Sequence, residues 1–263
     1  MMIKMIKILC IGDVVGKEGT DYLASGGRLM KLRQQYGADL VIVNGENSAE
    51  GNGMTLLSAE SIFRSGADVI TGGNHTFKWR EIYDMLDDGG CAIRPANFPA
   101  VAPGLGCVTV DVNGYKVLVM NLIGTVYMEP VAPPIDCAKR ILTVEAGKYD
   151  IAVCDFHAEA TSEKLCFARY FDGQISVVFG THTHVQTADA QIMPDGTGYI
   201  TDLGMCGSHN GILGVRTEDI VKKFTEKVPV KFNPAHGNVK LTGAYFEVDP
   251  GTKKCVKAER VEA

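Results

Sequence analysis

Short and almost uninterrupted apolar runs, each ending at a glycine or a polar side chain, restrict the fold of this chain more than any other feature. Runs of this kind are typical of strands buried on both faces of a sheet. We expect such strands at residues 6–13, 39–44 and 68–71, and a helix at residues 19–36. The resulting βαβαβ order favours parallel strands joined by right-handed crossovers.

The second half of the chain has a different pattern. Runs at residues 108–112 and 116–122 flank Asn113-Gly114, which is a strong signal for a β-hairpin. Further strands are expected at residues 150–156, 175–179, 198–203, 239–248 and 254–261, with a helix near 162–171. Because the last two strands form a second hairpin through Pro250-Gly251, the sequence predicts two sheets rather than one open sheet.

Length and composition allow one sizeable core. The 263 residues are 46% hydrophobic, so we expect a single domain over residues 1–263, with the Pro- and Gly-containing stretch 96–106 as a loop. The net charge of -5 and the lack of long runs of like charge argue against a long nucleic-acid groove. Small phosphorylated substrates are compatible with this negative net charge, because a metal ion can supply positive charge locally.

The expected cellular location follows from three features that the sequence lacks. The eight cysteines form no C-x-x-C pair, and the first ten residues contain no signal-peptide core with a cleavage site. No apolar stretch reaches the ~18 residues of a membrane span. We therefore expect a cytoplasmic protein with reduced cysteines and no membrane partner.

Metal-capable side chains follow the predicted strands at the point where each strand ends. In an open α/β sheet, ligands gather outside the carboxyl ends of the strands, so these side chains are expected to converge. They are Asp13, Glu46, Asn74, His157, His182 and His184. The last two are alternate residues of an extended segment and point the same way, so they can reach two adjacent ions. The sequence therefore predicts one shared site built from five strand ends.

The types of side chain narrow the choice of ion. Carboxylates, an amide and imidazoles without thiolates suit transition metals, with Fe or Mn expected first and Zn or Co as alternatives. Six groups exceed the needs of one ion, whereas two ions about 3.5–4 Å apart share a bridging carboxylate, for which Glu46 is the candidate. Such a pair generates a hydroxide at neutral pH and neutralises charge on phosphoryl oxygens. The predicted chemistry is metal-dependent phosphoester hydrolysis.

Five strand-end segments carry a family pattern. They are Gly12-Asp13-Val14-Val15-Gly16, Asn44-Gly45-Glu46-Asn47, Gly72-Gly73-Asn74-His75, Phe156-His157-Ala158-Glu159 and Gly180-Thr181-His182-Thr183-His184. The pattern resembles that of calcineurin-like metallophosphoesterases. Two of the segments differ from the usual motifs of that superfamily: G-D-V-V-G stands in place of D-x-H, and G-E-N in place of G-D-x-x-D. With these substitutions and with residues 184–189 and 202–205, the whole chain is similar to the bacterial YmdB-like metallophosphoesterases. The resemblance implies a four-layer αββα sandwich of two mixed β-sheets flanked by helices.

The resemblance also implies a role for each site residue. The implied ligands of one ion are Asp13, Glu46, Asn47 and His184, and those of the other are Glu46, Asn74, His157 and His182. His75 is implied to be a catalytic proton donor to the leaving oxygen rather than a ligand. The implied substrates are small phosphodiesters, the 2',3'-cyclic and in some cases the 3',5'-cyclic nucleotides, and the implied assembly is a homo-oligomer.

Five further residues are open to more than one interpretation. His209 is a candidate for substrate contact, and His236 is expected at the surface. Glu159 and Asp189 fit either an orienting contact with a ligand histidine or a structural salt bridge. Trp79, the only tryptophan, is expected to pack in the core, with stacking on a base as the alternative.

Other functions compete with a cyclic-nucleotide phosphodiesterase. They are a nucleotide-sensing or partner-binding regulator with slow hydrolysis, a phosphomonoesterase, an RNA-directed nuclease and a metal-dependent amidohydrolase. His75 argues against a pure sensor, because binding alone needs no proton donor. Amidohydrolase sites commonly have other strand-end motifs, so that class is disfavoured.

Overall fold

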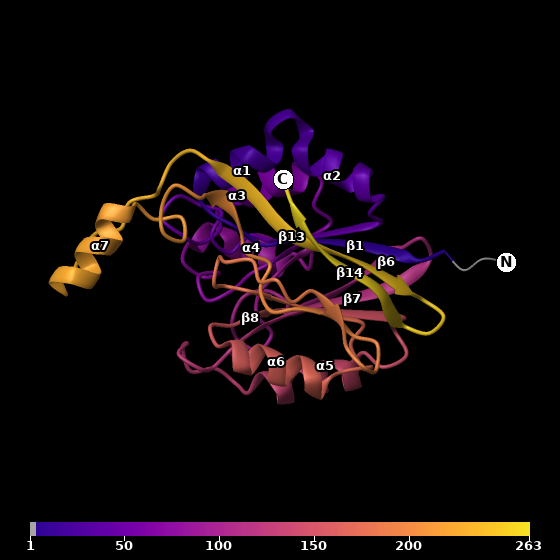
Figure 1. The fold of residues 1–263 in the computed structure, drawn as a ribbon. Coiled ribbons are helices and arrows are strands. Elements are labelled where there is room, and N and C mark those ends of the chain that lie inside the picture. The colour runs from indigo at the N-terminus through magenta and orange to yellow at the C-terminus, as the bar shows by residue number, and fades with distance from the viewer. Residues whose placement is uncertain (1–3) are drawn as a thin grey trace.

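Two mixed β-sheets pack face to face, with helices on both outer sides (Figure 1). The structure is a computed structural model that describes residues 4–263. The helices are α1 (Gly16–Ala24), α2 (Arg28–Tyr36), α3 (Leu56–Arg64), α4 (Tyr83–Asp87), α5 (Pro134–Val144), α6 (Thr161–Tyr170) and α7 (Thr217–Glu226). Residues 1–3, which begin the segment where the sequence predicted no cleavable signal, lie outside the described residues. Within residues 4–263, no helix combines the length and apolar character that crossing a bilayer requires.

The first sheet has eight strands in the order β2-β12-β13-β1-β3-β4-β5, with β14 paired to β13. Their bounds are β1 (Ile6–Ile11), β2 (Asp13–Val14), β3 (Leu40–Asn44), β4 (Val69–Thr71), β5 (Ala92–Ile93), β12 (Met205–Ser208), β13 (Val239–Asp249) and β14 (Lys254–Glu262). As predicted, β1, β3 and β4 run parallel, whereas β13 is antiparallel to β1 and pairs Val248 with Ile6. The carboxyl ends of β1, β3 and β4 therefore meet at one edge of the sheet.

The second sheet has six strands in the order β10-β11-β9-β8-β7-β6. Their bounds are β6 (Cys107–Val112), β7 (Tyr115–Ile123), β8 (Ile151–His157), β9 (Val177–Thr181), β10 (Gln191–Ile192) and β11 (Gly198–Ile200). Strands β6 and β7 form the predicted hairpin around Asn113-Gly114, and β7, β8 and β9 are parallel. This sheet also brings the carboxyl ends of its central strands to one edge.

Three apolar layers hold the sheets and helices together. Along β1, Ile8 and Cys10 pack between the two sheets, whereas Leu9 and Ile11 pack beneath α1 and α2, because successive strand residues point to opposite faces. A third layer, which includes Phe167, joins residues of the second sheet to residues of the helices α5 and α6. Figure 1 shows these two helices on the outer side of that sheet. The predicted fold of two sheets flanked by helices is confirmed.

The expected continuous helix at residues 19–36 is wrong. Helix α1 ends at Ala24, a 3-10 turn covers Ser25–Gly27, and α2 begins at Arg28. Gly26 and Gly27 have φ angles of 60° and 66°, a left-handed conformation that glycine adopts without steric cost. The chain therefore turns between two separate helices that cover the first sheet.

The first predicted strand also breaks, at Gly12 between β1 and β2. A Cβ atom at Gly12 would lie 2.2 Å from the carbonyl oxygen of Gly204, so only glycine permits this approach of the two backbones. The amide of Asp13 then donates to that carbonyl at 3.1 Å. This close approach places the Asp13 side chain at the edge where the parallel strands end.

Candidate metal centre

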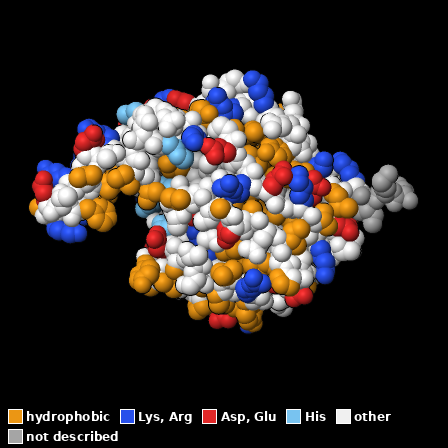
Figure 2. Space-filling view, in the orientation of Figure 1, with side chains coloured by type: hydrophobic (Ala, Val, Ile, Leu, Met, Phe, Trp, Pro, Cys, Tyr) orange, Lys and Arg blue, Asp and Glu red, His pale blue; other side chains and the backbone are white. Residues whose placement is uncertain are grey.

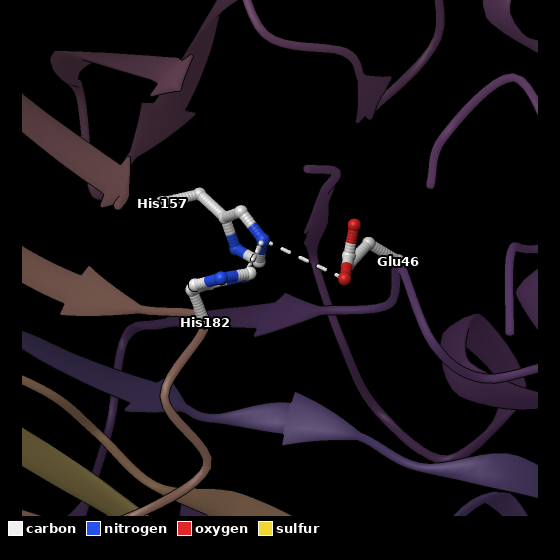
Figure 3. A group of neighbouring side chains, drawn as sticks. All are labelled: Glu46, His157 and His182. Carbon is white, nitrogen blue, oxygen red and sulfur yellow. Dashed lines mark hydrogen bonds and ion pairs between the residues drawn. The ribbon is translucent and has the colours of Figure 1, made fainter. Parts of the chain in front are cut away.

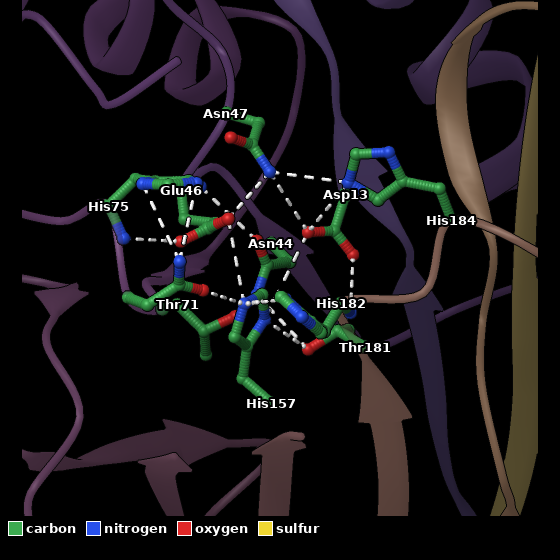
Figure 4. A network of polar contacts seen from close by, with 12 residues as sticks. Asp13, Asn44, Glu46, Asn47, Thr71, His75, His157, Thr181, His182 and His184 are labelled. Carbon is green, nitrogen blue, oxygen red and sulfur yellow. Dashed lines mark hydrogen bonds and ion pairs between the residues drawn. The ribbon is translucent and has the colours of Figure 1, made fainter. Parts of the chain in front are cut away.

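All seven predicted ligand residues lie together at the edge where the carboxyl ends of both sheets meet. Figure 4 labels all of them except Asn74. The first sheet and the loops after its strands contribute Asp13, Glu46, Asn47 and Asn74, and the second contributes His157, His182 and His184. Strand β8 ends at His157, whereas the other histidines follow β9. The site is thus shared between the two sheets.

One group of donor atoms surrounds Nε2 of His157. This nitrogen lies 3.0 Å from Asn74 Oδ1, 3.1 Å from His182 Nδ1 and 3.5 Å from Glu46 Oε1. Atoms bound to one ion at about 2.0–2.2 Å lie about 3–3.5 Å apart, so the spacing fits a shared ion. Figure 3 shows Glu46, His157 and His182, whose ligand atoms all lie within 4.8 Å of one another. These four residues can hold one transition-metal ion.

Neighbouring side chains orient both imidazoles of this group. Thr181 Oγ1 donates to Asp155 Oδ1 at 2.7 Å and so accepts from His157 Nδ1 at 2.9 Å, which leaves Nε2 of His157 with its lone pair. Glu159 Oε2 lies 3.1 Å from His182 Nε2, on the side of that ring away from His157. Such contacts fix the ring orientation and the tautomer of metal-binding histidines. Glu159 therefore lies in the orienting position.

A second group of atoms surrounds the side-chain amide of Asn47. Its Nδ2 lies 2.5 Å from Glu46 Oε1, 3.4 Å from Asp13 Oδ1 and 3.3 Å from His184 Nε2. His184 Nδ1 faces the carbonyl of Leu213 at 3.1 Å, so Nε2 is the atom left for a ligand bond. Asn47 Oδ1 is buried and has no hydrogen-bond partner within residues 4–263. Turning the amide over brings this oxygen among three acceptor atoms, an arrangement that a cation satisfies.

The charges of the buried groups are also poorly matched without a cation. Burial and the negative charge of Asp13 raise the pKa of Glu46 to about 8. Burial opposes the ionisation of Asp13, but the hydrogen bond and charge of His184 hold the pKa of that carboxyl well below its usual range. Burial lowers the pKa of His157, which favours its neutral form. Asp13 thus has the charge of His184 beside it. Glu46 instead lies beside the neutral ring of His157, so a positive ion at that position would stabilise its buried carboxylate, and the donor set fits metal.

His75 lies beside the ligand atoms rather than among them. Its backbone N–H donates to Glu46 Oε2 at 2.8 Å, and its ring Nε2 lies 3.2 Å from Asn74 Nδ2 and 3.4 Å from Asn52 Nδ2. Burial and the charge of Lys78 lower the pKa of His75. Asn52 was not predicted from the sequence: its position between two glycines indicates a turn but no contact with His75.

Trp79 does not pack in the core, so that expectation is wrong. Its side chain is 39% exposed, and its Nε1 donates to the carbonyl of Asn52 at 2.8 Å. A Cβ atom at Gly53 would lie 2.7 Å from the indole ring, so the turn containing Asn52 packs directly on Trp79. Trp79 therefore supports the turn that contacts His75.

Three other polar residues lie apart from the ligand atoms. His236 is exposed, as predicted, and its Nδ1 lies 3.1 Å from Glu18 Oε1. Asp189 accepts hydrogen bonds from Thr187 and Thr201, so it does not orient a ligand histidine. The backbone N–H of His209 donates to the carbonyl of residue 238, and its Nε2 is buried without a hydrogen-bond partner among the described residues, so no such bond joins it to a predicted ligand.

The match to a family model covers almost the whole chain. The model of the YmdB-like protein family matches residues 9–261. The chain belongs to the YmdB-like family. One relative, the 2',3'-cyclic-nucleotide 2'-phosphodiesterase of Bacillus subtilis, is 46% identical over 256 residues, which are 97% of this chain and 96% of the relative. The family predicted from the strand-end motifs is confirmed.

Solved structures of similar proteins agree with this assignment. One from Mycoplasma pneumoniae, described as a novel phosphatase, has a TM-score of 0.93 and 36% identity, and the match covers 100% of this chain and 94% of that one. A hypothetical protein from Thermus thermophilus has a TM-score of 0.91 and 35% identity, with 98% and 99% covered. This YmdB-like protein is therefore an enzyme of a phosphatase and phosphodiesterase family.

Proposed function

We propose that this YmdB-like protein is a metal-dependent phosphodiesterase that hydrolyses small cyclic nucleotides, with 2',3'-cyclic nucleotides as the first candidates and 3',5'-cyclic nucleotides as the second. The observation that carries the proposal is the convergence of donor atoms around His157 Nε2 and Asn47 at the shared edge of the sheets. The activity for which the Bacillus subtilis relative is named supports the choice of substrate.

The ligand residues divide into two sets that share Glu46. One set is Asp13, Glu46, Asn47 and His184, and the other is Glu46, Asn74, His157 and His182. When bound, two transition-metal ions, Fe or Mn first and Zn or Co as alternatives, lower the pKa of a water molecule and neutralise charge on the phosphoryl oxygens. The protein contributes the fixed geometry, because the hydroxyl of Thr181, the carboxylate of Glu159 and the carbonyl of Leu213 each contact one of the three imidazoles.

His75 is the proposed proton donor to the leaving oxygen. Its backbone is fixed by Glu46, and the amides of Asn52 and Asn74 lie against its ring, so the imidazole is positioned next to the ligand atoms. A lowered pKa favours the neutral ring in the free enzyme. The negative charge of a bound phosphodiester has the opposite effect, so the substrate itself favours the protonated donor.

Hydrolysis by the full chain tests this function. With manganese added, the protein should hydrolyse 2',3'-cyclic AMP, and His75→Ala should lower kcat about 10²–10⁴-fold, the usual contribution of a general acid. Metal content, measured by mass spectrometry, should be unchanged in this variant, and His236→Ala is the control at an exposed histidine. The proposal fails if metal-loaded protein leaves every phosphodiester intact.

The same assay separates the remaining substrate classes. Rates on 2',3'-cyclic AMP, 3',5'-cyclic AMP, p-nitrophenyl phosphate and short RNA distinguish a cyclic-nucleotide enzyme from a phosphomonoesterase or an RNA-directed nuclease. Saturable nucleotide binding without product, at full metal content, would instead identify a regulatory sensor.

A further inference from the structure

The arm that connects β12 to β13, residues 209–238, touches the metal centre at its base. The carbonyl of Leu213 accepts from His184 Nδ1 at 3.1 Å, so this part of the arm lies directly against a predicted ligand. Figure 2 shows hydrophobic side chains exposed where the arm joins the body of the protein. Ile212 and Leu213 are 37% and 46% exposed, and Val185, the residue after His184, is 57% exposed. These three side chains form an apolar rim beside His184.

Leu213 has a backbone conformation that leucine rarely adopts. Ile212 and Val215 exchange two backbone hydrogen bonds, at 2.8 and 3.0 Å, and the two residues between them have φ angles of 53° and 86°. Two central residues with positive φ are characteristic of a type I′ turn, in which Asn-Gly is a favoured pair. The pair here is Leu213-Gly214, and the side chain of leucine makes a positive φ costly. The turn therefore carries a leucine where its geometry favours asparagine.

The surroundings hold this turn in place. A Cβ atom at Gly214 would lie 2.8 Å from Val15 Cγ1, so the turn packs on the residue that follows β2. The backbone N–H of Ala235, from the returning part of the arm, donates to the carbonyl of Gly214 at 2.9 Å. Strained conformations that the surrounding structure enforces in this way cluster at active sites and ligand clamps. Asparagine would present the same carbonyl to His184 with less strain, so the feature that the strain retains is the leucine side chain.

The two sides of the metal centre offer different surroundings to a substrate. Figure 4 shows His75 and His184 on opposite sides of the ligand carboxylates. The exposed side chains of Asn52 and Lys78, on the side of His75, are polar, whereas the rim beside His184 is apolar. In a 2',3'-cyclic nucleotide, the base and both ester oxygens belong to one ribose, so a phosphate at the metal centre brings the base close to its rim. An aromatic base gains most from apolar surface.

We propose that the apolar rim of Val185, Ile212 and Leu213 contacts the base of the cyclic-nucleotide substrate, with Leu213 as the specificity-determining residue. The inference rests on the proposed function. Aliphatic side chains offer a base neither a hydrogen-bond donor nor an acceptor, so the contact favours a nucleoside ester over a base-free ester without selecting one base.

Two substrates that differ only in the base test the inference in the full, manganese-loaded chain. They are 2',3'-cyclic AMP and methyl riboside 2,3-cyclic phosphate, which has a methoxy group in place of adenine. In the wild type, kcat/KM should be about tenfold higher with the base, as expected for one aliphatic side chain removed from water. In Leu213→Asn this ratio should fall toward one, because asparagine keeps the turn but not the apolar contact. Leu213→Met, which stays apolar, should keep the ratio.

Lys253→Asn is the matched control for the relief of strain. Lys253 also has a positive φ, 62°, but it lies in the turn between β13 and β14, beside the end of β13 that pairs with the start of β1. Both asparagine variants should have a raised Tm, whereas only Leu213→Asn should change the ratio. Metal content and sedimentation of Leu213→Asn should match those of the wild type, which excludes an effect through His184 or through assembly.

Three results would overturn the inference and leave the proposed function intact. The wild type could hydrolyse both esters with equal kcat/KM, or Leu213→Asn could keep the wild-type ratio. Leu213→Asn could also lose metal and slow both reactions equally, which would assign Leu213 a role through His184 alone. If the wild type hydrolysed neither these esters nor any other phosphodiester, the proposed function would fail, and the inference with it.

Discussion

Gly73 lies where the two sheets bring their ligand atoms together. A Cβ atom at this position would lie 2.5 Å from both Glu46 Oε2 and His157 Nε2. We expect Gly73→Ala to displace these two side chains and to lower metal affinity at least about tenfold. Metal titration checks this, with Gly90→Ala as the control, because no atom lies within 4 Å of a Cβ atom there. Unchanged affinity in Gly73→Ala would contradict the proposed ligand role of His157.

Thr181 determines which nitrogen of His157 is available to a metal. Thr181→Val removes the hydroxyl that accepts from His157 Nδ1 and donates to Asp155. We expect metal affinity to fall about 10–100-fold, the usual effect of losing such an orienting contact. Calorimetric titration with manganese measures the change. Thr143→Val, at an exposed position of α5, removes an equivalent hydroxyl and should have no effect.

Individual residues were predictable from the sequence where they follow a strand. Asp13 and His157 could be placed because the carboxyl ends of parallel strands meet, whatever the details of packing. Asn52 and Trp79 could not, because their positions depend on a turn and on neighbours distant in sequence. Whether the seven predicted ligands bind metal stays a prediction that the titrations above address.

At the level of elements, a buried ion pair joins α6 to the loop after β11. Lys164 Nζ lies 2.7 Å from Asp202 Oδ2 and also donates to the carbonyl of Thr181 at 2.8 Å. The same carboxylate accepts from the amide of Thr183, so the pair supports the segment that carries the ligand histidines.

Lys164→Met should lower the free energy of unfolding by about 3–5 kcal/mol, because it leaves the carboxylate of Asp202 buried without its partner. Urea unfolding followed by circular dichroism gives the value. Lys148→Met breaks an ion pair whose lysine is 61% exposed and should leave the midpoint unchanged. A wild-type midpoint for Lys164→Met would show that the pair contributes nothing to stability.

Elements with a strong local signal were predicted, and those that depend on distant neighbours were not. The parallel strands and both hairpins follow from apolar runs and turn residues. Strand β2 has two residues and exists because it pairs with β12, far along the chain, so no local pattern reveals it. Two consecutive glycines, Gly26 and Gly27, indicated a break in the helix, but the helical spacing of the apolar residues on both sides favoured a continuous helix. Helix α7 was missed, although its apolar residues have helical spacing.

At the scale of the whole molecule, bound ions would link the two sheets, since each proposed ligand set includes residues from both. A ligand at 100 times its dissociation constant stabilises the folded state by about 2.7 kcal/mol. For a chain of this size we expect saturating manganese to raise Tm by about 5–10 °C relative to protein treated with a chelator. Thermal unfolding measures the shift. Asp13→Ala should abolish it, and an equal shift in that variant would contradict the proposed ligand set.

Strand β13 occupies the centre of the first sheet, between β1 and β12, although β1 lies near the other end of the sequence. While the chain is being synthesised, β1 leaves the ribosome long before β13 exists. During that interval, one side of an almost wholly apolar strand has no partner, a state that favours aggregation. Protease treatment of ribosome-bound chains that stop at residue 238 should therefore cleave β1, and resistance to cleavage would contradict this. Because β13 is made late, one edge of β1 stays without its neighbouring strand until most of the chain has been synthesised.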